Sequence, residues 1–384
     1  MPLPQLSQKQ AALVFNALPG LGSVSCRRIS DAFGGDLAQA LSAGVPALAR
    51  VVNRTLAERI ANWREFFDLE KEERLLAEKN ARFVPAFDDA FPPLLKQIPA
   101  PPIGLYVAGN PDVLAATDAV AIVGTRKASL YGATNARKFA RELAARGLTI
   151  VSGGAIGIDT EAHRGALEAP NGKTVAVLGC GINVVYPRSN AALFREIVAR
   201  GGALASEFPL GRQADRQTFP QRNRVIAGLT AGTLVAESDI AGGSIITANF
   251  AAELGRTVFA LPNRIDQPRS RGCHKLIREG AILVSSVDDL LEDLTGTPAQ
   301  TLLDFGENSS ESDEKSAAEL PNTENLSAEA RKILATLADG TARTPDELSG
   351  QLGLPFPLVS ANLLLLEIDR RVARRADGAY EIRL

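Results

Sequence analysis

Residues 119–124 form the stretch Ala119-Val120-Ala121-Ile122-Val123-Gly124, an apolar run that ends in glycine. Short apolar runs of the same kind recur at residues 148–151, 174–178, 203–205, 232–236 and 257–260. Runs without polar alternation are typical of strands buried on both faces, and the segments between them have helical spacing. Because strands that alternate with helices form right-handed βαβ units, the sequence predicts an α/β fold with a Rossmann-like, doubly wound parallel sheet.

The region before this sheet has a helical pattern from residue 8 to residue 81, including a long charged helix predicted over Trp63 to Lys79. Within it, Pro19, Gly20 and Gly22 form a turn between two short helices, which is typical of a helix-hairpin-helix or SAM-like domain. Backbone amides in such a hairpin can face a phosphate, but the same glycines also suit a tight turn between packed helices. The function of the hairpin stays open.

The last segment predicts a winged helix, with three helices and then a hairpin around Asp377 and Gly378. Its third helix contains neither lysine nor arginine between Phe356 and Glu367. The basic residues instead cluster after that helix and on the wing, at Arg370, Arg371, Arg374 and Arg375. Contact with DNA and contact with a protein therefore both remain open for this module.

Domain boundaries follow from these changes of pattern. We expect a helical domain over residues 1–82, an extended Rossmann-like domain over 83–298 and a winged helix over 326–384. The proline-rich stretch from Phe83 to Tyr106 predicts an extended connector, because proline disfavours regular helix. Residues 299–325 are rich in acids and serine, and this composition predicts a flexible linker.

Bulk composition restricts the possible functions. The 42 basic and 44 acidic residues leave a net charge of -2, so any binding of nucleic acid has to come from a local patch. Neither a secretion signal nor an apolar stretch of about 20 residues is present, which predicts a cytoplasmic protein without a membrane span. Three separated cysteines and two histidines predict neither a disulfide framework nor a zinc site.

Glycine- and hydroxyl-rich loops follow the predicted strands. In an open parallel sheet, ligands bind beyond the carboxyl ends of the strands, where backbone amides and helix dipoles attract anions. The sequence therefore predicts an anionic ligand at this edge. The candidate residues in these loops are Gly124, Thr125, Arg126, Ser129, Gly153, Gly154, Gly157, Gly242, Gly243, Ser244 and Thr247.

A basic and aromatic segment indicates which anion to expect. Four arginines and one acid lie between Arg212 and Arg224, and the candidates here are Arg216, Phe219, Arg222, Asn223 and Arg224. Single-stranded nucleic acid is bound by such a mixture, with charge for the backbone and a ring for base stacking. Alternatively, Phe219 fills core and Arg222 pairs with an acid such as Glu207 or Glu237.

Catalytic candidates are weak. Asp159 is expected to cap a helix, and His163, among small residues, to be structural. The first loop lacks the G-x-G-x-x-G pattern of dinucleotide sites. No nucleophile, catalytic dyad or metal cluster stands out in the sequence. We therefore expect no catalytic residues, cofactor or metal.

These motifs together resemble the DNA-processing protein A (DprA/Smf) family. The resemblance rests on Ala121 to Arg126 with Ser129, Tyr131 and Gly132, on Ser152 to Asp159 with His163, on Phe219 to Gly228 and on Gly243 to Ala248, and it spans residues 91–286. It implies a non-catalytic protein that binds single-stranded DNA (double-stranded DNA more weakly) and loads the RecA recombinase during natural transformation. It also implies a homodimer formed through the Rossmann-like domain. Arg216 stands where many relatives have lysine, which keeps the charge.

Two other functions compete with this interpretation. Nucleotide phosphoribohydrolases of the same superfamily share the early glycine loops, but they need a Pro-Gly-Gly-x-Gly-Thr loop followed by a glutamate. The corresponding loop here runs from Ala241 to Thr247 without that glutamate in register. In the third hypothesis, the chain is mainly a scaffold whose winged helix recruits partners.

Overall fold

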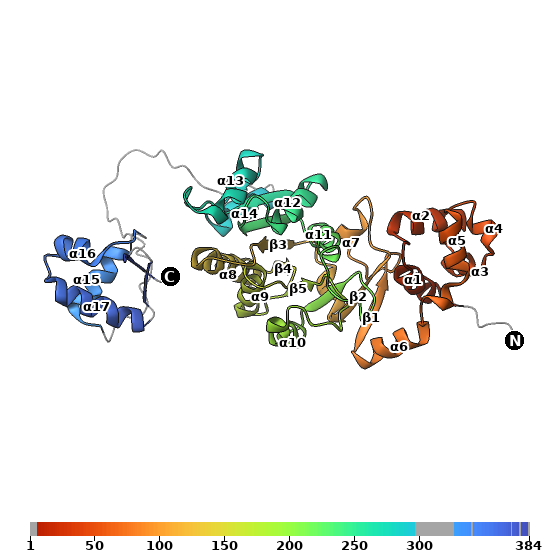
Figure 1. The fold of residues 1–384 in the computed structure, drawn as a ribbon, viewed down its shortest axis with the longest axis horizontal. Coiled ribbons are helices and arrows are strands. Elements are labelled where there is room, and N and C mark those ends of the chain that lie inside the picture. The colour runs from red at the N-terminus through yellow and green to blue at the C-terminus, as the bar shows by residue number, and fades with distance from the viewer. Residues whose placement is uncertain (1–5, 296–325, 339–340, 370, 376–377, 383–384) are drawn as a thin grey trace, which may run out of the picture. The chain divides into compact units, whose positions relative to one another are not determined.

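A computed structural model describes residues 6–295, 326–338, 341–369, 371–375 and 378–382. The chain divides into two compact units, Met1–Thr301 and Leu302–Leu384 (Figure 1). The predicted acidic linker 299–325 lies outside the described residues, as do Arg370 and Asp377 of the predicted wing.

A nine-stranded sheet forms the centre of the first unit, in the order β1-β2-β6-β5-β4-β3-β7-β8-β9. All neighbours from β6 to β9 are parallel, and β3 lies between β4 and β7. The predicted Rossmann-like parallel sheet is thus confirmed, and the chain order reverses at β3. The strands are β1 (Ala81–Pro85), β2 (Gly104–Gly109), β3 (Ala119–Gly124), β4 (Thr149–Ser152), β5 (Thr174–Val177), β6 (Ala203–Ser206), β7 (Gly232–Glu237), β8 (Thr257–Ala260) and β9 (Ile282–Leu283).

The predicted extended connector between Phe83 and Tyr106 is wrong. This stretch contains β1 and β2, which pair antiparallel with each other, while β2 continues antiparallel onto β6. The short helix α7 (Pro93–Lys96) lies between them, with a proline at its first position, where the missing N–H is not needed. Prolines end the strand and start the helix here, so they mark the boundaries of regular elements.

Helices cover both faces of the sheet (Figure 1). Alternate residues of β3 point to opposite faces, so that Ala121 joins one buried cluster and Ile122 another. The Ala121 cluster holds residues of α7, α11 (Thr218–Gly228), α12 (Gly243–Glu253) and α13 (Arg271–Arg278). The opposite face packs against α8 (Leu130–Ala145), α9 (Ile158–Glu168), α10 (Ala191–Ala199) and α14 (Val287–Thr295). Three 3₁₀ turns, η2 (Pro111–Leu114), η3 (Arg188–Asn190) and η4 (Pro268–Ser270), complete the connections.

The N-terminal region is helical and shares its core with the edge of the sheet, because Phe83 and Tyr106 belong to its buried cluster. The predicted hairpin lies between α1 and α2, and Gly20 there has a φ of 79°. The predicted long helix from Trp63 to Lys79 is interrupted, because Asp68 is extended and its side chain accepts a hydrogen bond from the Lys71 amide. The elements are α1 (Gln8–Ala17), α2 (Ser23–Ala32), α3 (Leu37–Ser42), α4 (Val45–Leu48), α5 (Arg54–Ala61), η1 (Trp63–Glu65) and α6 (Leu69–Glu78).

The second unit has the predicted winged-helix order of three helices and a hairpin: α15 (Ala328–Leu337), α16 (Pro345–Leu352), α17 (Phe356–Ile368), β10 (Val372–Arg374) and β11 (Tyr380–Ile382). Leu348, Leu363 and Tyr380 belong to its buried core. Within the described part of the chain, no single helix is long and apolar enough to cross a membrane. Only α16 and α17 taken together, across a 119° bend, meet that test of length and composition.

Candidate nucleic-acid interface

A cavity of about 230 Å³ lies at the carboxyl end of β3, where the chain order of the sheet reverses. Open α/β sheets bind ligands at this position, because helix N-termini from both sides of the reversal converge there. The cavity brings together the predicted residues Gly124, Thr125, Arg126, Phe219, Arg222, Asn223, Gly242, Gly243, Ser244 and Thr247. Asp159 is the one carboxylate among its described lining residues.

The first loop of the cavity is fixed by backbone contacts. The Thr125 amide donates to the Glu237 carbonyl at 2.7 Å, and the Thr125 carbonyl accepts from the Ile158 amide at 3.2 Å. A Cβ at Gly124 would lie 2.5 Å from Cγ1 of Ile158 and 2.7 Å from the Glu237 carbonyl oxygen. Glycine is therefore required by the close approach of three loops, whether or not a ligand binds.

The N-terminus of α12 forms another wall. Gly243 and Ser244 are the first residues of this helix and line the cavity. The Asn223 side chain donates to the Gly243 carbonyl at 3.2 Å, and the Ser244 hydroxyl donates to that of Ser238 at 2.8 Å. These bonds fix a helix end whose dipole is positive toward the cavity, an arrangement that attracts an anion.

Arg222 lies beneath this cavity as a structural residue. Its guanidinium is buried and donates to the carbonyls of Gly153 and Val177, and its Nε donates to the Asn223 side chain at 3.2 Å. The expected alternative, an ion pair with Glu207 or Glu237, is wrong. Burial raises the pKa of the Asp159 carboxyl, while the positive charge of Arg222 opposes that shift.

An aromatic pair with a cation lies beside the cavity. The Arg126 guanidinium carbon is 4.8 Å from the centroid of the Phe219 ring, and the centroids of the Tyr186 and Phe219 rings are 5.7 Å apart. Arg126 is exposed and forms no ion pair with any residue that the structure describes, and Tyr186 is 44% exposed. Phe219 is half-buried, so its ring is not simply core. Tyr186 was not predicted from the sequence; the available signal was an aromatic residue in the loop after β5.

The remaining arginines of the predicted basic segment differ from one another. Arg224 pairs with Glu207 and donates to the Ala100 carbonyl at 2.7 Å, so it ties α11 to neighbouring loops. Arg212 pairs with Asp215 at 2.5 Å. Arg216 is exposed in the loop before α11 and has no ion pair with a described residue. The segment therefore offers one unpaired, exposed arginine, although the sequence contains four.

Four further predicted residues, Ser129, Gly153, Gly154 and Gly157, do not line the cavity. Ser129 caps α8 by accepting from the Gly132 amide at 3.1 Å, and its own amide donates to the Glu237 carboxylate at 2.7 Å. Gly154 and Gly157 have φ values of 67° and 84°, and the Gly153 carbonyl accepts from Arg222. These residues shape the loops, and the structure does not place them among the lining residues.

The two weak catalytic candidates, Asp159 and His163, have different surroundings in the structure. The expected cap at Asp159 is wrong, because Gly157 is the N-cap of α9 and the Asp159 carboxylate accepts from the Ala155 amide at 3.2 Å. His163 is fully buried with Nδ1 2.7 Å from the Thr174 hydroxyl, and burial together with the Arg222 charge lowers its pKa to about 3. Among the described residues, no three His, Cys, Asp or Glu side chains are grouped to hold a metal ion.

The fold and this cavity define a Rossmann-like protein with cations and an aromatic pair at the topological switch point of its sheet. The chain belongs to the DNA recombination-mediator protein A family, whose family model matches residues 82–295. Residues 316–378 match the model of the DprA winged helix domain.

Individual relatives support this membership. The chain is 40% identical to Protein Smf of Escherichia coli over 80% of this chain and 79% of that protein. The X-ray structure of DNA processing protein A (DprA) from Streptococcus pneumoniae superposes with a TM-score of 0.64 at 34% identity, covering 75% of this chain and 99% of that one. A structure of DNA processing protein A from Helicobacter pylori, whose name specifies a single-stranded DNA binding mode, gives a TM-score of 0.51 at 28% identity. It covers 56% of this chain and 96% of that chain.

Proposed function

We propose that this chain is a non-catalytic protein that binds single-stranded DNA in the cavity at the carboxyl end of β3. The observation that carries the proposal is the group formed by Arg126, Phe219 and Tyr186 beside a helix N-terminus that lines the same cavity. A cation and backbone amides suit a phosphate, and the exposed Tyr186 ring suits an unpaired base.

This arrangement favours single strands over duplexes. The Tyr186 and Phe219 rings can stack only on a base whose face is free, whereas bases inside a duplex already stack on one another. Double-stranded DNA would then keep the phosphate contacts and lose the stacking, so it binds more weakly. The similarity to the Helicobacter pylori protein, named for its single-stranded DNA binding mode, is in keeping with this preference.

The non-catalytic part of the proposal rests on how the polar groups of the cavity are used. Asp159 is the one carboxylate among the described lining residues and accepts the Ala155 amide, while Arg222 donates to two main-chain carbonyls. The competing hypothesis is a nucleotide phosphoribohydrolase. Incubation with AMP separates the two, because release of ribose 5-phosphate at ordinary enzymatic rates would favour the hydrolase.

The proposed cellular role is to protect incoming DNA in the cytoplasm and to load RecA during natural transformation. Family membership supports this role. We further propose a homodimer through the Rossmann-like domain, at the edge of β9, where Leu283 is half-exposed and the described sheet ends. An open strand edge is a surface on which a second copy can pair. Sedimentation of wild type against Leu283→Glu tests the dimer, and retention on immobilised RecA tests the partner.

A salt-titrated binding assay tests the DNA proposal. Oligothymidylate and a hairpin duplex are titrated against wild type, Arg126→Glu and Arg216→Ala, with Arg54→Ala on α5 as a matched loss of an exposed arginine. Arg126 lines the cavity, whereas Arg216 lies outside its lining residues, in the exposed loop before α11. Both variants should weaken binding of the single strand and flatten its salt dependence, because each removes a phosphate contact worth a slope of about 0.7. Wild-type affinity in both variants would remove the assignment of this cavity.

A further inference from the structure

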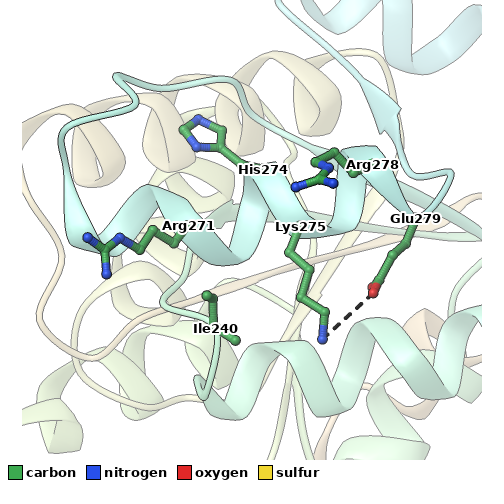
Figure 2. Close-up of a pocket in the computed structure, with 6 residues that line it drawn as sticks. All are labelled: Ile240, Arg271, His274, Lys275, Arg278 and Glu279. Carbon is green, nitrogen blue, oxygen red and sulfur yellow. Dashed lines mark ion pairs between the residues drawn. The ribbon is translucent and has the colours of Figure 1, made fainter.

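The two edges of the nine-stranded sheet have different neighbours. At one edge, α13 leads into β9, where we propose the second copy, and the groove of about 500 Å³ along α13 lies on this side (Figure 2). At the other edge, β1 packs against α1 and α6 of the N-terminal helices. Contacts made by α1 and α6 are therefore separate from the proposed dimer interface.

Two side chains of the N-terminal helices bind the main chain of the β6–α11 loop, residues 207–217. The Asn16 side chain on α1 donates to the Glu207 carbonyl at 2.9 Å, and the Glu72 carboxylate on α6 accepts from the Leu210 amide at 2.9 Å. The Leu210 side chain packs against the buried cluster of the same helices. The first half of the β6–α11 loop is thus held by the N-terminal helices.

Glu72 is a buried carboxylate, only 6% exposed, and it forms no ion pair with a residue that the structure describes. Burial raises the pKa of this carboxyl, while the hydrogen bond from the Leu210 amide opposes that shift. Burial, and then the Glu72 charge, raise the pKa of Tyr106 well above its ordinary range, so these two side chains lie close together. A buried carboxylate costs more than an apolar side chain of similar size, but it specifies which main-chain amide lies against it. This choice of residue favours a role in positioning the loop over packing alone.

The β6–α11 loop is joined to the loop after β5, which carries Tyr186. The Gly211 amide donates to the Asn183 side chain at 2.7 Å. Ile182, next to Asn183, is buried in the cluster that the N-terminal helices form with the edge of the sheet. Both loops that border the aromatic pair are therefore in contact with the N-terminal helices.

Arg216 lies in the second half of the β6–α11 loop. The Asp215 carboxylate accepts from the Gln217 and Thr218 amides at 2.8 and 2.9 Å, which fixes this half to the start of α11. Arg216 is exposed between the two fixed ends, and Phe219 of the cavity follows in the first turn of α11. The position of Arg216 relative to the cavity therefore depends on both attachments, one to α11 and one to the N-terminal helices.

We propose that Glu72 and Asn16 are positioning residues for the binding of single-stranded DNA, because they order the loop that carries Arg216 before a strand arrives. The proposal rests on the proposed function of the cavity and gives the N-terminal helices a role that needs no contact with DNA. A long side chain loses freedom when it binds a phosphate, and a loop that is already held in place lowers this entropic cost. If the two hydrogen bonds only attached the helices to the sheet, their loss would lower stability and leave DNA affinity unchanged.

A double-mutant cycle in the full chain tests this proposal. Glu72→Met removes the acceptor of the Leu210 amide at similar side-chain length, whereas Glu72→Gln keeps an acceptor oxygen. Each variant is titrated with oligothymidylate, alone and combined with Arg216→Ala. The matched control is Glu70→Met, the same substitution at an exposed position of α6. Asn16→Leu repeats the cycle at the second contact.

Glu72→Met should weaken oligothymidylate binding about 2- to 10-fold, which corresponds to the cost of ordering one long side chain. Glu72→Gln and Glu70→Met should bind as wild type. In the Arg216→Ala background the loss caused by Glu72→Met should be smaller, because the side chain that Glu72 positions is already absent. Unchanged affinity in folded Glu72→Met, or the same fold loss in both backgrounds, would overturn the proposal. If Glu72→Met does not fold, the same two criteria apply to Asn16→Leu. Failure of the wild type to bind oligothymidylate would instead refute the proposed function of the cavity.

Discussion

Replacement of Arg222 separates a structural role from a ligand-binding role within one cavity. Arg222→Met keeps most of the side-chain length and removes the guanidinium. The carbonyls of Gly153 and Val177 then lose their donor in a buried site, at about 1–3 kcal/mol each. The nearby Asp159 also loses its compensating charge, so we expect a total loss of about 3–5 kcal/mol in the free energy of unfolding.

The matched variant is Arg126→Gln, which removes an exposed arginine from the same cavity. Because Arg126 has no ion pair with a described residue, its loss should change stability by no more than about 0.5 kcal/mol while weakening DNA binding. Urea unfolding followed by tryptophan fluorescence suits this comparison, since Trp63 is the single tryptophan of the chain and is buried in the first unit. If Arg222→Met unfolds at the wild-type urea concentration, the structural role assigned to Arg222 is refuted.

Three further predictions concern single positions. Tyr186→Ala should weaken oligothymidylate binding by about 1–3 kcal/mol, the usual contribution of one stacked base, with thermal stability close to wild type; undiminished affinity would remove Tyr186 from the interface. Gly124→Ala should destabilise the protein by about 1–3 kcal/mol in urea unfolding, because its Cβ meets Ile158, whereas Gly243→Ala has open space and should be tolerated. His163→Gln should flatten the pH dependence of unfolding, because burial lowers the pKa of His163 from 6.5 to about 3. Above pH 6.5 the neutral His163 makes its full contribution to the free energy of unfolding. Below pH 6.5 this contribution declines, and wild type should have lost about 2 kcal/mol at pH 5. Equal losses of stability in wild type and His163→Gln between pH 7.5 and pH 5 would contradict this.

Much of the central fold could be predicted because its signal is local. Each inner strand is a short apolar run, and burial on both faces requires such runs wherever helices cover a parallel sheet. The strands β1 and β2 were missed for the opposite reason. Prolines border them and the helix between them, and the antiparallel pairing of β2 with β6 depends on a strand about a hundred residues away.

The position of the candidate site could be predicted from the sequence, but the contacts that its individual side chains form could not. The spacing of the arginines in the sequence does not reveal that Arg224 forms an ion pair with Glu207. It also does not reveal that Arg222 is buried and donates hydrogen bonds to main-chain carbonyls. Both outcomes depend on tertiary contacts between separate strand ends. Tyr186 was missed because its proximity to Phe219 exists only in the folded chain.

Photo-cross-linking tests the central claim most directly. An oligonucleotide that contains 5-iodouracil is irradiated with the full chain, and the cross-linked peptides are identified by mass spectrometry. We predict adducts at Tyr186 or Phe219, which fall sharply in Arg126→Glu. Adducts found only in the winged helix, or only in the N-terminal helices, would contradict a DNA site at the carboxyl end of β3.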